Sequence, residues 1–186
     1  DIYYGNFSLF QSLPDIWAID QLFPIMPIHR LDEEPTRNAI IADITCDCDG
    51  KIDKFIGQHE VSNTLPLHEL KAGEEYYLGV FLVGAYQEIL GELHNLFGDT
   101  DSVDVYIDDN GKVALQSAQQ GDTVAKVLQY VNFDIPKLQQ AYSDILQGSD
   151  LASEEKELFL AELEKTLVSP TYLHIWYAKK ESKKVN

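Results

Sequence analysis

The chain has 186 residues, of which 45% are hydrophobic and 24% are charged, a balance that is ordinary for a globular protein of one or two domains. Its formal net charge of −17 is unusual, and it argues against binding to nucleic acids or to anionic membrane surfaces, which require basic patches. The excess of carboxylates favours a cationic substrate or partner, although an acidic surface also serves simply to keep a protein soluble. No apolar run approaches the ~20 residues of a membrane-spanning helix.

Short apolar segments predict strands through the first half of the chain. The first would run from Tyr3 to Leu13 and end at Pro14. Pro24 and Pro27 exclude a helix between Ala18 and Leu31, where a short extended piece is expected instead. The expected strands lie at 3–13, 38–45 and 76–83, with shorter extended pieces at 25–31 and 51–57. The intervening segments at 32–36, 46–50 and 58–75 are polar or acidic and are expected to be loops and turns.

The apolar period then changes from that of a strand to that of a helix. Apolar residues recur at helical spacing from Ala85 to Leu93, which predicts a helix over about 86–96. Gly98 is expected to stop it.

A hairpin signal follows. Two alternating apolar runs, 103–107 and 112–116, flank Asn110-Gly111, and an Asn-Gly pair in this position is typical of a tight hairpin turn.

After Gly121 the pattern becomes helical throughout. We expect helices from Asp122 or Thr123 to Tyr130, from Leu138 to Leu146 with Pro136 leading into it, and from Ser153 to Leu167. The predicted organisation is therefore α+β, with a β-rich domain at 1–120, a helical region at 121–175 and a frayed tail at 176–186.

The chemically most suggestive segment is Cys46-Asp47-Cys48-Asp49-Gly50, where a thiol and a carboxylate adjoin at a strand-to-turn junction. Such a thiol can deliver a proton, and the carboxylate can hold a cationic group. In many proteins, however, a lone cysteine is only a small buried hydrophobe and Asp-Gly only a turn. Cys46 and Cys48 are too close for an unstrained disulfide, so free thiols are expected, as in a reducing cytoplasm.

Metal binding by the same segment finds little support. A calcium loop with Gly50 at its sixth position would need a carboxylate at its twelfth, where Ile56 stands. A zinc site would need two ligands beyond Cys46 and Cys48, and the five histidines are scattered singly.

Several longer runs, taken in order, resemble the C-terminal region of the biosynthetic arginine decarboxylase family. They lie at 6–15, 17–28, 31–37, 43–47, 83–91 and 94–100. The run at 83–91 contains Gly84-Ala85-Tyr86. The resemblance extends to about Leu173 and is weakest at 57–75 and over the last ~50 residues.

The resemblance implies a pyridoxal-phosphate enzyme of fold type III, like alanine racemase and ornithine decarboxylase, that converts arginine to agmatine and CO2 for polyamine synthesis. In that family a cofactor-bearing barrel precedes a C-terminal β-barrel or sandwich domain, and the active site lies between two subunits of a homodimer or higher oligomer. By resemblance, Cys46 is the proton donor to the decarboxylated carbanion, Asp47 and Phe97 contact the substrate, and Tyr86 contacts the cofactor. Mg²⁺ is a possible further cofactor of the family, with no ligands assigned.

None of the lysines lies in a motif that matches the family's cofactor lysine. The chain starts at Asp1 and leads directly into an apolar run, which we interpret as part of a larger cytoplasmic enzyme that is inactive without its N-terminal barrel. The alternative hypothesis is a stand-alone acidic interaction or regulatory domain that keeps the fold without the chemistry.

Overall fold

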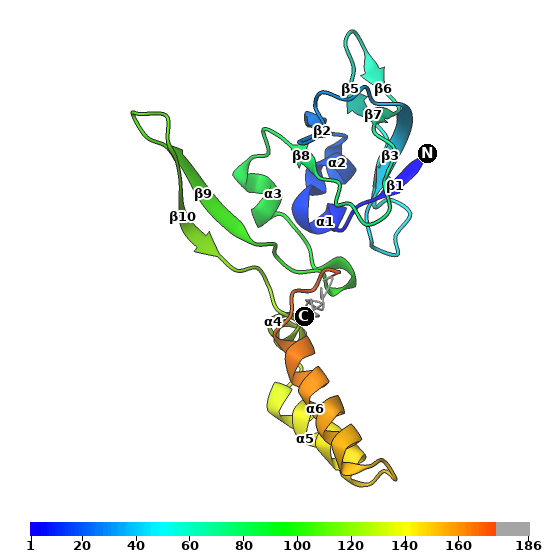
Figure 1. Ribbon diagram of the computed structural model, residues 1–186, viewed down its shortest axis with the longest axis vertical. Helices are drawn as coiled ribbons and strands as arrows, with labels where there is room; N and C mark the ends of the chain where they lie inside the picture. Colours follow the sequence, from blue (N-terminus) through cyan, green and yellow to red (C-terminus); the bar gives the residue numbers. More distant parts are fainter. Residues whose placement is uncertain (174–186) are drawn as a thin grey trace, which may run out of the picture. The chain divides into compact units, whose positions relative to one another are not determined.

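A computed structural model of the chain describes residues 1–173, and these residues fall into two compact units (Figure 1). The first unit spans Asp1–Asp122 and contains all the strands of the described residues, and the described part of the second, which begins at Thr123, is helical. The tail expected at 176–186 lies outside the described residues. Within the described residues, no helix is both long and apolar enough to cross a membrane.

Four strands form the central sheet of the first unit. The longest of them, β3, pairs in parallel with β1 through Ile41 and Tyr3, and antiparallel with β4 and β7. Along β3 the side chains of Ala39 and Ile41 are buried while their neighbours are more exposed, which is the two-residue period of a strand with one buried face. The strands of this sheet are β1 (Ile2–Tyr4), β3 (Arg37–Ala42), β4 (Lys51–Ile52) and β7 (Leu65–Leu67).

The remaining strands pair two by two, each pair antiparallel. They are β2 (Ile25–Pro27) with β8 (Leu78–Val80), β5 (Phe55–Ile56) with β6 (Val61–Ser62), and β9 (Ser102–Ile107) with β10 (Val113–Gln119). Three short helices, α1 (Leu9–Ser12), α2 (Pro14–Ile19) and α3 (Ala85–Ile89), and a 3-10 turn, η1 (His94–Leu96), complete the unit. The mixed α and β composition is thus confirmed, but the described strands form separate small sheets and no closed barrel.

One hydrophobic core lies beneath the central sheet. Leu9 of α1 and Leu13, which directly follows that helix, cover it on one side, and β3, β4 and β7 contribute from the sheet side. Its buried members are Leu9, Leu13, Phe23, Ala39, Ile41, Ile52, Phe55, Leu65 and Leu67. Burial of such side chains is the main source of stability of a unit this size.

The β9–β10 hairpin forms as the Asn-Gly signal predicts, with Val113 opposite Ile107 (Figure 1). Gly111 takes a positive φ of 77°, and the Asp108 carboxylate accepts hydrogen bonds from the backbone N–H groups of Asn110 and Lys112. All residues of both strands are exposed, including several valines and Tyr106.

The helical unit also follows its sequence signals. It comprises α4 (Val124–Tyr130), α5 (Ile135–Gln147) and α6 (Ser153–Leu167). The side chains of Thr123 and Asp134 cap α4 and α5, and Glu155 accepts a hydrogen bond from Ala152 N–H at the start of α6. The apolar stripe of α6 is less buried than its pattern indicates, because Leu158 and Phe159 are exposed while Leu167 is buried.

The strand predicted over 3–13 is wrong beyond Tyr4. The chain turns into α1 instead, because Ser8 caps the helix through Gln11 N–H and the distant Asp43 accepts from Leu9 N–H. Pro14, expected to end a strand, occupies the first position of α2, where its missing N–H is not needed.

The helix predicted over 86–96 stops at Ile89. Gly91 approaches α1 so closely that an added Cβ would lie 2.4 Å from the Gln11 carbonyl oxygen, and Glu92 N–H donates to the Phe10 carbonyl. These contacts draw the chain out of the helix, and Ile89 and Leu90 are left exposed.

Two further expectations also need correction. The loop at 58–75 contains the short strands β6 and β7, and the strand at 76–83 is reduced to β8. The left-handed φ of Leu82, 60°, ends the extended conformation there, and Phe81 and Val83 are exposed rather than buried.

Candidate functional site

The loop that carries Cys46 and Asp47 is fixed at its base by a buried carboxylate. Asp43 directly follows β3 and is only 3% exposed. Its backbone N–H donates to the Gly50 carbonyl (2.8 Å), which closes the loop. Its Oδ2 accepts from Leu9 N–H (2.8 Å), and its Oδ1 accepts from both the N–H (2.9 Å) and the hydroxyl (2.8 Å) of Thr45. One charge-assisted hydrogen bond therefore anchors the loop to the start of α1.

Gly50 completes this base. A Cβ at this position would lie 2.2 Å from Asp43 Oδ1 and 2.6 Å from Thr45 Oγ1, so a side chain cannot be accommodated without displacing the buried carboxylate. Gly50 is thus a structural requirement of the loop, and the predicted turn at 46–50 is confirmed.

Cys46 lies on this loop with an exposed, free thiol. The alternative interpretation, that it is a buried packing residue, is therefore wrong. Its backbone N–H donates to Asn95 Oδ1 (2.8 Å), and Asn95 Nδ2 in turn donates to Cys46 Sγ (3.4 Å). The thiol is thus available to a ligand and is held from one side by a single amide.

Asp47, the next residue, is also exposed. One of its carboxylate oxygens accepts from Asp49 N–H (2.9 Å), and its carbonyl accepts from Gly50 N–H (3.1 Å). These bonds shape the loop and leave the carboxylate open to solvent, where it can meet a cationic group.

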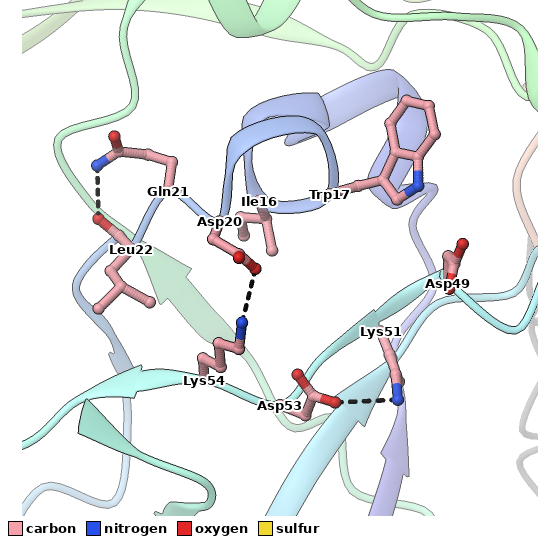
Figure 2. Close-up of a pocket in the computed structure, with 9 residues that line it drawn as sticks. All are labelled: Ile16, Trp17, Asp20, Gln21, Leu22, Asp49, Lys51, Asp53 and Lys54. Carbon is pink, nitrogen blue, oxygen red and sulfur yellow. Dashed lines mark hydrogen bonds and ion pairs between the residues drawn. The ribbon is translucent and has the colours of Figure 1, made fainter.

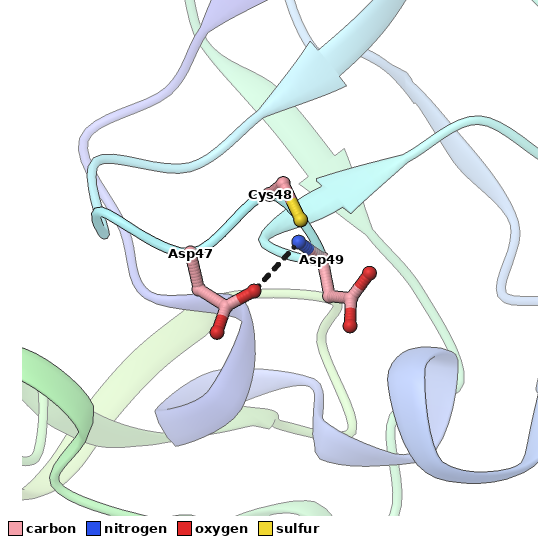
Figure 3. Close-up of side chains that lie close together, drawn as sticks. All are labelled: Asp47, Cys48 and Asp49. Atoms are coloured by element: carbon pink, nitrogen blue, oxygen red, sulfur yellow. Dashed lines mark hydrogen bonds between the residues drawn. The ribbon is translucent and has the colours of Figure 1, made fainter.

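Cys48 lies between two carboxylates, and Figure 3 shows the side chains of Asp47 and Asp49 on either side of its position in the loop. One ligand atom from each of the three residues lies within 4.8 Å of the others. This set does not suit Mg²⁺, which prefers six oxygen ligands, because the central group is a soft thiol. It also falls short of the four ligands of a structural zinc site.

Phe97 belongs to the segment that holds Cys46. It directly follows η1, its N–H contacts the His94 carbonyl (3.4 Å), and its side chain is half-buried. The His94 ring packs on Phe10 with ring centroids 4.7 Å apart, which secures this segment to α1. The structure therefore brings Cys46, Asp47 and the Phe97 segment together through Asn95.

Tyr86 is placed differently. It lies in the first turn of α3 after Gly84, is 74% exposed, and makes no hydrogen bond with the Cys46 loop within the described residues. Its neighbour Gln87 is buried and fixes α3 to α2, since it accepts from Asp15 N–H (3.1 Å) and donates to the Asp15 carboxylate (2.6 Å). A cavity of about 310 Å³ lies beside this turn, and Gly84 and Ala85 are among its lining residues.

A second cavity, of about 140 Å³, lies between α2 and the segment around β4 (Figure 2). Two ion pairs line it, Lys54 with Asp20 (2.8 Å) and Lys51 with Asp53 (2.9 Å). Each lysine donates a hydrogen bond to its aspartate, and this bond is the main cause that raises the pKa of the lysine, which favours the protonated amine. A lysine that binds a carbonyl cofactor needs the opposite, a neutral amine.

Sequence reasoning singled out Cys46, Asp47, Phe97 and Tyr86 but assigned no role to Asn95 or Asp43. Asn95 is 49 positions from Cys46, and no local pattern signals their contact. Asp43 had a weak signal, because a single carboxylate at the end of an apolar strand needs partners if it is buried.

Comparisons with known proteins match this chain to one family. Residues 124–173 match the family described as the arginine decarboxylase C-terminal helical extension. The chain is 48% identical over 175 residues to the biosynthetic arginine decarboxylase of Chromobacterium violaceum, covering 94% of this chain and 28% of that protein. It is 54% identical over 178 residues to the protein of the same name from Phocaeicola vulgatus, with 93% and 28% covered. The resemblance to the C-terminal region of biosynthetic arginine decarboxylases is confirmed.

The fold agrees with this assignment. The crystal structure of the biosynthetic arginine decarboxylase from Campylobacter jejuni superposes with a TM-score of 0.83 at 39% identity, covering 93% of this chain and 29% of that one. The helical region, where the resemblance was expected to be weakest, carries the family match. The chain spans about 28% of the length of the curated relatives it matches. A stand-alone regulatory domain is not favoured by these matches.

Proposed function

We propose that this chain is the C-terminal portion of a pyridoxal-phosphate-dependent arginine decarboxylase, and that it contributes proton-donor and substrate-binding groups to the active site. The reaction would convert arginine to agmatine and CO2 in polyamine biosynthesis. The observation that carries the proposal is the similarity to biosynthetic arginine decarboxylases over more than nine-tenths of the chain. The exposed thiol and carboxylate of Cys46 and Asp47 supply the chemistry that this chain would add.

Cys46 is proposed as the proton donor to the substrate carbon that loses CO2. Its thiol is exposed, on a loop whose base is fixed by Asp43, so a proton can be delivered from a defined position. The S–H bond breaks as the new C–H bond forms, and the resulting thiolate is reprotonated from water.

Asp47 is proposed to bind the guanidinium group of arginine. A carboxylate is a strong partner for a guanidinium, with which it can form two parallel hydrogen bonds. Phe97, in the segment joined to Cys46 through Asn95, is proposed to pack against the substrate's aliphatic chain.

Pyridoxal phosphate, when bound, supplies the electron sink that decarboxylation requires. We assign the exposed phenol of Tyr86 to contact with it, and the cofactor lysine to the remainder of the enzyme, because none of the lysines of this chain lies in a motif that matches the family's cofactor lysine. Any Mg²⁺ that the enzyme binds is proposed to lie outside the cluster of Asp47, Cys48 and Asp49, which does not suit it.

The small sheets are proposed to form part of a β-barrel or sandwich that other segments of the enzyme complete. Exposed apolar side chains support this view, with examples on β1, on the β9–β10 hairpin and on α3. We further propose a homodimer or higher oligomer, with Cys46 and Asp47 serving the partner subunit's active site, in the cytoplasm, where free thiols persist.

The experiment compares Cys46→Ala with Cys48→Ala in the complete enzyme. Both thiols are exposed and lie two residues apart, so each variant controls for the other. Cys46→Ala is expected to slow agmatine formation by roughly 10²-fold or more, within the range of a general acid, and to shift the product toward misprotonated forms. Cys48→Ala is expected to change little. Small and equal effects of the two substitutions would overturn the assigned role of Cys46.

A further inference from the structure

Asn95 forms hydrogen bonds with both the backbone N–H and the Sγ of Cys46, and its own backbone adopts an energetically unfavourable left-handed conformation. Its φ and ψ are 55° and 23°, and the following Leu96 also has a positive φ, 62°. Left-handed residues other than glycine are uncommon, although asparagine tolerates the region better than most. Two in succession store strain of the kind that is often found at functional sites.

The orientation of the Asn95 amide follows from its partners. The Cys46 backbone N–H can only donate, so the side-chain oxygen must face it, at 2.8 Å. The NH₂ group is then the one that faces Cys46 Sγ, at 3.4 Å. The amide therefore accepts from the backbone of Cys46 and donates to its sulfur at the same time.

We propose that Asn95 is a positioning residue for Cys46, which fixes the direction of the thiol and stabilises the thiolate left after proton transfer. This rests on the proposed role of Cys46 as proton donor. An N–H group already aimed at an atom where negative charge develops lowers the barrier, because it needs no reorganisation during the reaction. Asn95 itself need not touch the substrate for this role.

Two substitutions separate the two hydrogen bonds. Asn95→Asp keeps an oxygen for the Cys46 N–H and tolerates the left-handed backbone, but it loses the donor to Sγ and adds a negative charge beside it. Asn95→Gly keeps the backbone conformation at no steric cost and loses both bonds. Asn132 is a matched control, since it is also left-handed (φ 69°) and lies in the helical unit, so Asn132→Asp is expected to behave as wild type.

The main measurement, in the complete enzyme, is the amount of agmatine formed per CO2 released, together with kcat and KM. For Asn95→Asp we expect kcat to fall about 10-fold or more, KM to change by less than about 3-fold, and the agmatine yield per CO2 to drop. A fold defect alone would lower both products together and leave their ratio unchanged. Asn95→Gly should lower the yield in the same direction, and Asn95→Asp should add nothing further in a Cys46→Ala background.

A second measurement needs no turnover. The rate of iodoacetamide alkylation at Cys46, read by mass spectrometry with Cys48 as the internal reference, should fall about 3-fold or more in Asn95→Asp, because a carboxylate beside the sulfur disfavours the reactive thiolate. An unchanged product ratio and alkylation rate in both Asn95 variants, while Cys46→Ala lowers the ratio, would overturn the role of Asn95 alone. A ratio unchanged in Cys46→Ala itself would overturn the proposed function of Cys46 instead.

Discussion

Replacing Asp43 by asparagine is expected to destabilise the chain strongly, although Asp43 is not assigned any contact with substrate. The carboxylate accepts three hydrogen bonds, one on Oδ2 from Leu9 N–H and two on Oδ1 from Thr45. An asparagine offers only one acceptor oxygen. If that oxygen keeps the two Thr45 donors, the NH₂ group is turned toward the N–H of Leu9, a residue that is 0% exposed.

The magnitude follows from this exchange. A hydrogen bond to a charged group contributes about 1.5–3 kcal/mol, and a buried donor left without a partner costs about 1–3 kcal/mol. We therefore expect Asp43→Asn to lower the free energy of unfolding by about 3 kcal/mol. Because total stabilities are only about 5–15 kcal/mol, this is a large share.

The assay is urea denaturation followed by circular dichroism, with equal m-values for the variants so that midpoints compare stability. Asp47→Asn is the control, as it lies in the same loop, is exposed and accepts one hydrogen bond, and it should change stability by less than about 0.5 kcal/mol. A loss below about 1 kcal/mol for Asp43→Asn, or equal losses for both variants, would refute the view that Asp43 anchors the loop.

Three further predictions concern charge, cofactor and assembly. The 186-residue chain incubated with pyridoxal phosphate and labelled arginine should release no CO2 above a blank, and turnover by the purified chain would contradict the assignment of the cofactor lysine to another part of the enzyme. Mixing a Cys46 variant with a cofactor-lysine variant of the complete enzyme should restore roughly a quarter of wild-type activity if subunits exchange at random. Half of the dimers are then mixed, and each mixed dimer holds one intact site out of two. No recovery despite proven exchange would place both groups in one subunit. The hydrogen bond from Arg30 lowers the pKa of Glu33 below its ordinary value of 4.5. This carboxylate therefore stabilises the fold above pH 4.5, and the stabilisation is lost as the pH falls through the lower pKa of the folded state. An NMR titration should show the pKa of Glu33 rise in Arg30→Gln, and an unchanged value would disprove the pairing.

Elements with strong local signals were predictable from the sequence. The Asn110-Gly111 hairpin, the capped helices α4 and α5, and the end of α6 at Leu167 all form where the pattern indicates. The elements that differ are governed by distant contacts. The start of α1 depends on Asp43, 34 positions away, and the early end of α3 depends on the approach of Gly91 to α1.

The same distinction applies to the candidate site. Cys46 and Asp47 are adjacent in sequence, so their proximity and the turn that follows them could be predicted directly from the sequence. The resemblance supplied their proposed roles. The contribution of Asn95 could not be read in this way, because it depends on a left-handed turn and on an amide that meets Cys46 across 49 positions. Period and composition carry no information on such a contact.

The loop combines a buried, fully bonded base with an exposed tip, and these two properties serve different needs. The role proposed for Cys46 requires a rigid support that holds the thiol in one direction, and it also requires the thiol to remain accessible to the substrate. Asp43 and Gly50 provide this support at the base of the loop. Displacing the Asp43 carboxylate there would leave buried polar groups without hydrogen-bond partners. Asn95 provides a second attachment through its side chain, which holds Cys46 without covering the thiol. An isolated thiol–carboxylate pair on an unsupported loop would offer the same groups, but it would incur the entropic cost of ordering them in each catalytic cycle.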